Sequence, residues 1–274
     1  MTRQLTVEWA ADTSQFTPHQ FQARALLSVG FNAIWNWMRI HFVSYRRGIQ
    51  EYGLSWVIVG IEIDYQDRVT YFDADAFETV VEAVKLRKSR MLDFEVAFQI
   101  PGKRIATVQI RLFALKVTDE ASLSAIPGRV ERPLLDLFSA DEIDGYARLG
   151  INTSWLQHIE RNGSPLGTGV YPFSIHRHLC EVADQWCFTE LAGLVGAGRE
   201  CLVAAQRNDA ADLFRGLSSP MKALKADLRH AYFFFDEGRV ETRSYLLNDR
   251  VYFVHRLFSR DNQKDTYATV LEEF

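Results

Sequence analysis

The sequence has little cysteine and no long apolar run. Its three cysteines, Cys180, Cys187 and Cys201, are an odd number in a chain of 274 residues, which is too large to need disulfide staples. We therefore expect free thiols and a cytoplasmic location. The least polar stretch, residues 191–198, ends at Arg199 and is far shorter than the roughly 20 residues that cross a bilayer. The first residues lack the apolar core of an export signal, so no membrane partner is expected.

Lysine is also scarce, and the chain has no excess of positive charge. It contains 7 lysines and 24 arginines, and its formal net charge is −4. A sequence-wide basic field, which drives non-specific binding to nucleic acids, is therefore missing. We expect no nucleic-acid partner. The preference for arginine suits paired contacts to phosphates or carboxylates.

Two glycine-containing segments lack the features of nucleotide-binding loops. The run from Gly163 to Gly169 has no Lys-Ser or Lys-Thr pair, and Gly196-Ala197-Gly198 lies inside an apolar helical pattern without a preceding strand. Neither is a phosphate-binding fingerprint. No cofactor is predicted.

The first 117 residues predict one long helix followed by antiparallel strands. Residues 21–43 contain only Arg24 and Arg39 as charges. Their apolar residues recur at helical spacing on more than one side, which indicates a helix that is buried nearly all round. Apolar and polar residues then alternate with period two in residues 61–66, 94–100 and 106–112, as in strands with one buried face.

The second half repeats this order, with a helix predicted at 186–205 and strands at 251–257 and 267–274. Four short matches, separated by 160 to 163 residues, support a duplication. They pair Phe72-Asp73 with Phe235-Asp236, Glu78-Thr79 with Glu241-Thr242, Arg90 with Arg250, and Ala106-Thr107-Val108 with Ala268-Thr269-Val270. We therefore predict a first repeat at 1–117, a linker or lid at 118–169, and a second repeat at 170–274. Proline and glycine predict loops in the linker, with one short helix near 141–149.

An apolar helix wrapped by an antiparallel sheet, present twice, resembles the double hot-dog fold of acyl-thioester enzymes. Three passages resemble the acyl-acyl-carrier-protein thioesterases: residues 54–69, residues 87–112, and the segment from Ser174 to Glu190. The resemblance implies an α+β tandem hot-dog chain. It also implies an acyl-thioester hydrolase acting on acyl-CoA or an acyl carrier protein, in fatty-acid, polyketide or secondary-metabolite biosynthesis.

The sequence departs from that family at the catalytic motif. His176 stands where the family has Asn, and Ser174 where it has Asp. Only His178 keeps the family's residue type, and Arg229-His230-Ala231 replaces an Arg-Glu-Cys segment. These changes leave open a dehydratase, decarboxylase or acyltransferase of the same fold, and also a non-catalytic module that binds an acyl carrier.

Hydrolysis of a thioester needs a group that activates water and donors that hold the oxyanion. If residues 174–180 are extended, His176, His178 and Cys180 share one face of the strand. We predict His178 as the base, with His176 as its partner. Glu181 or Glu190 would fix the imidazole tautomer. Trp35, Met38 and Trp186 are the predicted substrate-binding residues.

Other interpretations of these residues remain. His176, His178 and Cys180 could bind a metal ion, but no fourth ligand is evident, so none is predicted. Cys180 is an alternative nucleophile or a small apolar filler. Asp12 lies with His19 where single-domain hot-dog thioesterases place their acidic catalyst, but it is predicted to be a cap or turn residue. Asp73 is predicted to form a turn. The aromatic run from Tyr232 to Phe235 is predicted to pack in the core or a tunnel wall. A homo-oligomer is left open.

Overall fold

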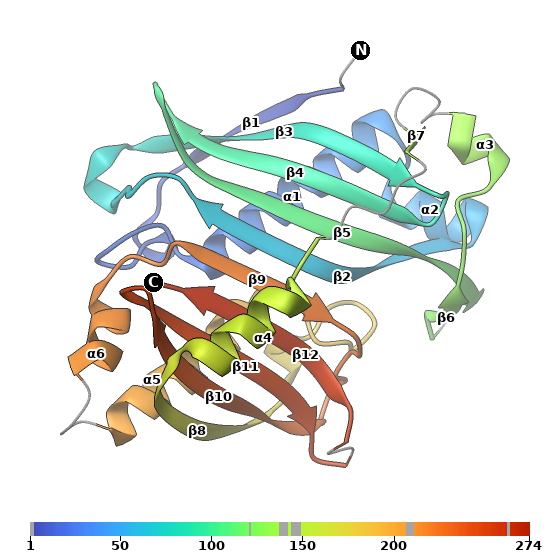
Figure 1. Cartoon of the computed structure of the whole chain (residues 1–274). Helices are drawn as coiled ribbons and strands as arrows, with labels where there is room; N and C mark the ends of the chain where they lie inside the picture. Colours follow the sequence, from blue (N-terminus) through green and yellow to red (C-terminus); the bar gives the residue numbers. More distant parts are fainter. Residues whose placement is uncertain (1–2, 121, 137–141, 144–148, 207–210, 262–263) are drawn as a thin grey trace.

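The structure is a computed structural model that describes residues 3–120, 122–136, 142–143, 149–206, 211–261 and 264–274. Within these residues, twelve strands form one sheet, antiparallel except where β7 joins β3. Two helices, α1 (Ala23–His41) and α5 (Leu191–Ala205), lie on the same face of this sheet, which we call the inner face (Figure 1). No helix in the described part of the chain is long and apolar enough to cross a bilayer.

The two halves of the sheet have the same strand order. The first half contains β1 (Leu5–Ala10), β2 (Leu54–Tyr65), β3 (Ala76–Arg87), β4 (Met91–Ile100) and β5 (Lys103–Asp119), and the second half contains β8 (Ser164–Ser174), β9 (Ala223–Leu228), β10 (Glu237–Leu247), β11 (Arg250–Ser259) and β12 (Thr266–Glu273). The orders β1-β3-β4-β5-β2 and β8-β10-β11-β12-β9 correspond strand for strand, and β2 pairs with β9 at the junction. This correspondence confirms the predicted tandem repeat.

The predicted central helices are present but begin later than the patterns indicate. Gln22 is extended, so α1 starts at Ala23. Its apolar residues, among them Leu27, Ile34 and Met38, are buried against the sheet. The second helix starts at Leu191 because residues 186–190 form a bridge and a short 3-10 turn, η5 (Phe188–Glu190), before it.

Shorter elements connect these parts. They are η1 (Thr13–Gln15), α2 (Tyr45–Tyr52), η2 (Tyr71–Asp73), β6 (Ser124–Pro127), α3 (Arg132–Leu135), β7 (Glu142–Ile143), α4 (Thr153–Asn162), η4 (Arg177–Leu179) and α6 (Ala211–Ser218). Asp12 caps η1, as predicted, and Asp73 lies in the turn η2, where it completes a capping box with Thr70. The helix predicted at 141–149 falls, for most of its length, outside the described residues.

The loop predicted at Gly163–Gly169 is wrong, because these residues begin strand β8. The glycines have a packing role there. A Cβ atom at Gly169 would lie 3.2 Å from Cβ of Leu202, and one at Gly167 would lie 3.3 Å from a Leu202 methyl group. Small residues therefore let α5 approach an edge strand, which also tolerates proline. The second half starts at β8, six residues before the predicted boundary.

The described end of the linker lies on the outer face of the sheet, opposite α1 and α5. Helix α4 packs there through Leu156 and Ile159 against Tyr245 and Tyr252 (Figure 1). Before it, the backbone N–H of Gly150 donates to Glu62 in β2. The next N–H donates to Asp227 in β9. The linker therefore straps the junction of the two halves from outside, and this part of it is not a lid over the inner face.

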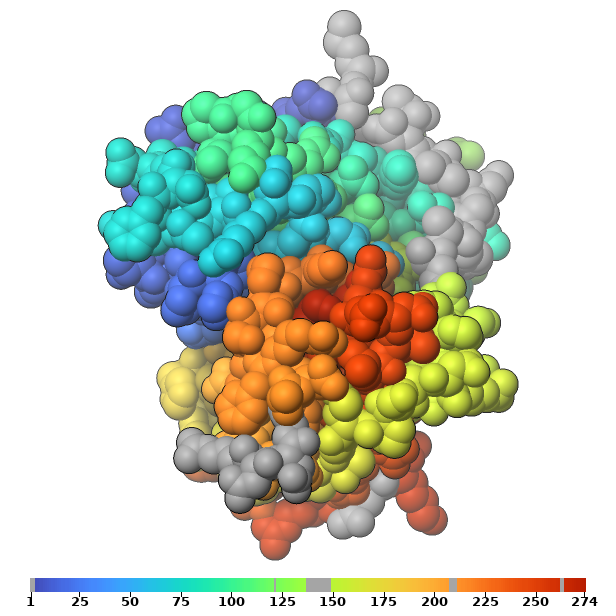
Figure 2. All heavy atoms as spheres, turned by 60° about the vertical axis from the view of Figure 1, so that its left-hand side comes forward, coloured from blue at the N-terminus to red at the C-terminus, as the bar shows by residue number. Residues whose placement is uncertain are grey.

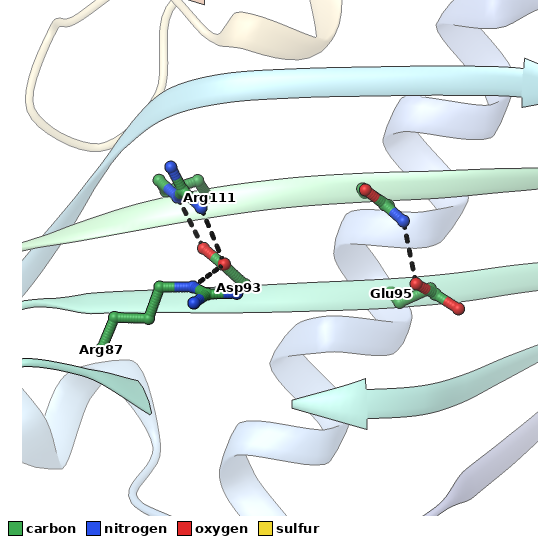
Figure 3. A network of polar contacts seen from close by, with 5 residues as sticks. Arg87, Asp93, Glu95 and Arg111 are labelled. Carbon is green, nitrogen blue, oxygen red and sulfur yellow. Dashed lines mark hydrogen bonds and ion pairs between the residues drawn. The ribbon is translucent and has the colours of Figure 1, made fainter. Parts of the chain in front are cut away.

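The outer face of the first half holds a buried ion cluster. Asp93 in β4 accepts hydrogen bonds from Arg87 in β3 and from two nitrogens of Arg111 in β5, and all three side chains are about nine-tenths buried (Figure 3). A second polar pair, Gln109 with Glu95, lies further along the same strands. Charges of this first half are thus buried on the side of the sheet away from α1.

Candidate functional site

The segment before α5 forms a turn, which overturns the extended geometry expected for it. Strand β8 ends at Ser174, and residues 177–179 form η4. His176 and His178 are both exposed. Their rings are nearly parallel, with centroids 6.0 Å apart. The two imidazoles therefore do lie together, but at the surface and not along one strand face.

Cys180 is not activated as a nucleophile. Its Sγ lies 3.6 Å from the backbone oxygen of His176. Burial raises the pKa of its thiol above the ordinary value, and the reactive form of cysteine is the thiolate. In the part of the chain that the structure describes, no three His, Cys, Asp or Glu side chains gather as metal ligands.

A first hollow, which we call the His176 cavity, lies between α5 and the β8–β10 edge of the sheet. Its volume is about 890 Å³, and His176, Trp186 and Glu190 are among its walls. Both carboxylate oxygens of Glu190 accept hydrogen bonds from Arg24, at 2.9 and 3.0 Å. Glu190 therefore ties the start of α5 to the start of α1, and its oxygens are already engaged.

A second hollow, the Glu181 cavity, lies where the two halves meet. It has a volume of about 480 Å³. The first half contributes side chains from α1, α2, β2 and β5, and the second half contributes residues 181–188 and 228–231. Trp186 lines both this cavity and the His176 cavity, so it is the wall between them.

Aromatic rings make up much of the Glu181 cavity. Phe31 packs edge-on against Trp35 and against Phe188, with centroids 5.0 and 4.5 Å apart. Trp35 in turn contacts Tyr45 at 5.0 Å. Edge-to-face packing of this kind holds rings in fixed places, so the cavity has a rigid apolar lining. Of the predicted substrate-binding residues, Trp35 and Trp186 lie in it, whereas Met38 is fully buried in the core.

Four titratable residues line this cavity, Tyr45, Glu181, Arg229 and His230, and two of them have a shifted pKa. Glu181 is exposed to solvent, yet desolvation by the surrounding protein raises the pKa of its carboxyl group. Burial likewise raises the pKa of Tyr45, and the charge of Glu181 adds to that effect. The Tyr45 hydroxyl lies 2.9 Å from Oγ of Ser55, which is buried. A carboxylate and a phenol from different halves therefore face one cavity.

Sequence reasoning missed Tyr45, Ser55 and His230 as members of this site. His230 also lines the Glu181 cavity, where its ring packs 5.0 Å from that of Tyr267. Two signals were present, because Ser55 belongs to the Leu-Ser-Trp-Val passage that carried the family resemblance, and His230 belongs to the segment that replaces the family's Arg-Glu-Cys. Tyr45 had no comparable signal, since its position depends on how α2 folds back onto β2.

Part of the aromatic run from Tyr232 to Phe235 differs from the prediction that it packs in the core. Tyr232 is buried beside Trp186, Phe173 and Tyr267. Phe233 and Phe235 are 50% and 73% exposed. Only part of the run therefore packs in the core.

Two helices on the inner face of a duplicated sheet define the double hot-dog fold, which confirms the predicted fold class. Among solved structures, the chain is similar to a Lactobacillus plantarum protein assigned as an oleoyl thioesterase, with a TM-score of 0.75, 9% identity, and coverage of 99% of this chain and 96% of that one. It is similar to the 12:0-ACP thioesterase from Umbellularia californica, with a TM-score of 0.72, 9% identity and coverage of 98% and 93%.

A third similar structure is an acyl-ACP thioesterase from Bacteroides thetaiotaomicron, with a TM-score of 0.65, 9% identity and coverage of 98% and 97%. No protein-family model matches the sequence, and no curated protein matches it. The shared property is therefore the fold over nearly the whole chain. The chemistry has to be argued from the residues of this chain.

Proposed function

We propose that the chain is an acyl-thioester hydrolase, acting on an acyl group carried by coenzyme A or an acyl carrier protein, with the Glu181 cavity as its active site. The observation that carries the proposal is an aromatic cavity between the halves, with an exposed carboxylate of raised pKa at its rim. Such a cavity suits an apolar acyl group, and the carboxylate suits proton transfer. The names of the three similar structures agree with this reaction class.

Glu181 is the proposed general base. In the reaction, a water oxygen forms a bond to the thioester carbonyl carbon while Glu181 accepts a proton from that water. The carbon–sulfur bond then breaks, and the sulfur leaves with the proton that Glu181 returns. The products are a carboxylic acid and a thiol, so no other reactant is needed. A raised pKa brings the basicity of Glu181 closer to neutral pH, where such transfers are most effective.

Tyr45 is the proposed donor to the oxyanion. Its hydroxyl group lies in the cavity wall, and its raised pKa keeps it protonated at neutral pH. A fixed O–H group directed at the developing charge is the usual form of oxyanion stabilisation. Ser55, at 2.9 Å from the Tyr45 oxygen, holds this hydroxyl in place.

A second arrangement follows from the His176 cavity. Here His178 would activate water and His176 would be its orienting partner, the roles predicted from the sequence. The contact between the two rings supports this arrangement. It places the acyl group on the other side of Trp186, against β8 and α5.

Single substitutions separate the two arrangements. We expect Glu181→Gln to lower kcat by about 10² to 10⁴, the usual contribution of a general base, with a small change in KM. Tyr45→Phe should lower kcat while the KM stays close to that of the wild type. His178→Ala should keep nearly full activity. Glu51→Gln should do so too, because Glu51 only forms an exposed ion pair with Arg47 on α2. Loss of hydrolysis in His176→Ala or His178→Ala, with full activity in Glu181→Gln, would instead assign the His176 cavity.

Product analysis by mass spectrometry tests the reaction class itself. Incubation with several acyl-CoA and acyl-carrier-protein thioesters should release free acid and free thiol. Unsaturated, decarboxylated or transferred acyl products would show a different enzyme of the same fold. Binding of the thioester without any product would show a non-catalytic acyl-binding module.

A further inference from the structure

A third hollow, the Arg199 cavity, is the counterpart of the Glu181 cavity in the duplicated fold. The Glu181 cavity is formed by α1, the segment before α5, and parts of β2, β5 and the end of β9. The Arg199 cavity, of about 690 Å³, is formed by α5, the segment before α1, the residues that lead into β9, and the end of β12. The helices, the segments before them and the β5 and β12 strands of the two cavities are therefore repeat partners, whereas the end of β9 has no counterpart in the Arg199 cavity.

Each helix also packs a glycine against the sheet, although the facing strands, β4 and β10, are not repeat partners. Gly30 in α1 faces Phe98 of β4, and Gly198 in α5 faces Thr242 of β10. The next residue on each helix lines a cavity: Phe31 on one side and Arg199 on the other. In Figure 2 a blue N-terminal segment lies beside the orange segment that contains α6, and residues from the segment before α1 and from α6 line the Arg199 cavity.

Arg199 presents hydrogen-bond donors that nothing accepts. Its side chain is 14% exposed, and its Nη1 donates to Oε2 of Glu272 at 2.6 Å. The buried Nε has no acceptor among the residues that the structure describes, and Nη2 is 4.0 Å from Glu200. An arginine has five N–H donors in a planar fork. A ligand with two acceptor oxygens would satisfy donors that the protein leaves free.

Glu272 does not depend on Arg199 alone. It is 1% exposed, and it lies 3.1 Å from Nε2 of His255, whose Nδ1 is 2.9 Å from the Thr242 hydroxyl. An ionised Glu272 only accepts, so Nε2 of His255 donates to it. Glu272 therefore keeps a hydrogen bond when the guanidinium turns toward a ligand.

We propose that the Arg199 cavity binds a monocarboxylic acid with an apolar body, through a paired contact to the Arg199 guanidinium. The other walls fit such a ligand, because Ala197, Leu217 and Met221 contribute apolar surface. A carboxylate fits better than a phosphate. Glu272 already stands beside Arg199, and a second negative charge on the ligand would add repulsion. This site is separate from the proposed active site and does not depend on hydrolysis.

Calorimetric titration of the full chain with octanoate at pH 7 tests the proposal. The wild type should bind octanoate, and octanamide of the same length should bind at least about 10-fold more weakly because it lacks the charge. Arg199→Met should weaken octanoate binding by a similar factor. Arg250→Met is the matched control, since Arg250 pairs with Glu273 on the opposite face of β12 and is half exposed. Its octanoate affinity should equal that of the wild type.

A second variant keeps the test valid if loss of Arg199 unfolds the protein. A Cβ atom at Gly196 would contact only Nη2 of Arg199, at 3.6 Å. Gly196→Leu therefore fills the cavity without changing its charge, and it should abolish octanoate binding while the Tm stays near the wild-type value. Wild-type affinity in both Arg199→Met and Gly196→Leu would overturn the site, as would absence of binding to the wild type. Tighter binding of inorganic phosphate than of octanoate would overturn the assignment to carboxylates.

Discussion

The two halves of the sheet share their strand order but differ in what their inner faces hold. In the first half, Thr79 of β3 stands opposite Phe98 of β4. In the second half, Thr242 of β10 stands opposite His255 of β11. Thr79 turns to Trp9 of β1, which donates a hydrogen bond to it at 2.9 Å. Thr242 has Gly169 opposite it in β8, and its hydroxyl bonds to His255 instead.

Buried charge therefore lies on opposite faces in the two halves. The cluster of Arg87, Asp93 and Arg111 is on the outer face of the first half (Figure 3). The network from Thr242 through His255 and Glu272 to Arg199 is on the inner face of the second half. The same fold accommodates buried charge on either face of the sheet. The cavity beside α1 is aromatic, whereas the cavity beside α5, where the inner face holds charge, is polar.

Replacing Glu272 should have the largest effect on stability. Its strand counterpart in the first half is Ile110, which is fully buried, so Glu272→Ile imitates the first half. The change leaves the buried Arg199 and His255 without an acceptor. Breaking a buried ionic contact from one side costs about 3–5 kcal/mol. Urea unfolding should show this loss in the free energy of unfolding.

Glu273 provides the control on the same strand. It pairs with Arg250 near the surface, and exposed ion pairs contribute about 0–1 kcal/mol. Glu273→Ile should therefore unfold close to the wild type. Equal unfolding free energies for Glu272→Ile and the wild type would show that the inner-face network does not stabilise the second half.

Acid should weaken the second half through Glu272. Burial alone would raise the pKa of this carboxyl group, but the charge of Arg199 and the hydrogen bond from His255 overcome that effect and lower the pKa to about 2. A carboxyl pKa lowered from 4.5 adds stability above pH 4.5, and that stability is lost as the pH falls toward 2. The difference corresponds to about 3 kcal/mol. Glu272→Gln should flatten the decline in unfolding free energy over this interval.

Glu181 should respond with the opposite sign. Its pKa is raised by desolvation, so the folded state favours the protonated form and loses stability as the pH rises above the unfolded value. Glu181→Gln should then be more stable than the wild type at pH 7, in the same urea titration. A less stable Glu181→Gln variant would show that the Glu181 cavity does not desolvate this carboxylate.

The sequence predicted those helices and strands whose buried apolar residues repeat at regular spacing. The helices and the strands with one dry face were found because residues such as Leu27, Ile34 and Phe98 repeat at the spacing of their element. Strand β8 was missed because Gly167 and Gly169 look like loop residues. Only the approach of Leu202 shows that they make room for a helix.

The site was predictable only in part, for a related reason. His176 and His178 were placed on a strand because their spacing alternates, but tertiary hydrogen bonds, such as the one from Cys187 N–H to the Leu179 carbonyl, impose a turn. The spacing of residues along the segment gives no information about that tertiary hydrogen bond. The inner-face network did leave a signal, because His255 occupies an inward position in the alternating run of β11. Its partner Glu272 follows Val270 in the same inward register.

The smallest expected difference between the halves concerns the two helix glycines. A Cβ atom at Gly30 would meet the Phe98 ring at 3.4 Å, whereas one at Gly198 would meet Thr242 Oγ1 at 3.0 Å and Val240 Cγ1 at 3.2 Å. Alanine favours a helix by up to about 1 kcal/mol over glycine, and crowding of a packed core costs about 1–3 kcal/mol. Gly30→Ala should therefore leave the Tm unchanged or slightly raised, and Gly198→Ala should lower it by a few degrees. A lower Tm for Gly30→Ala than for Gly198→Ala would mean that the aromatic residues around α1 adjust to an added methyl group less readily than the hydrogen-bonded residues around α5. The two halves would then not differ in packing as proposed.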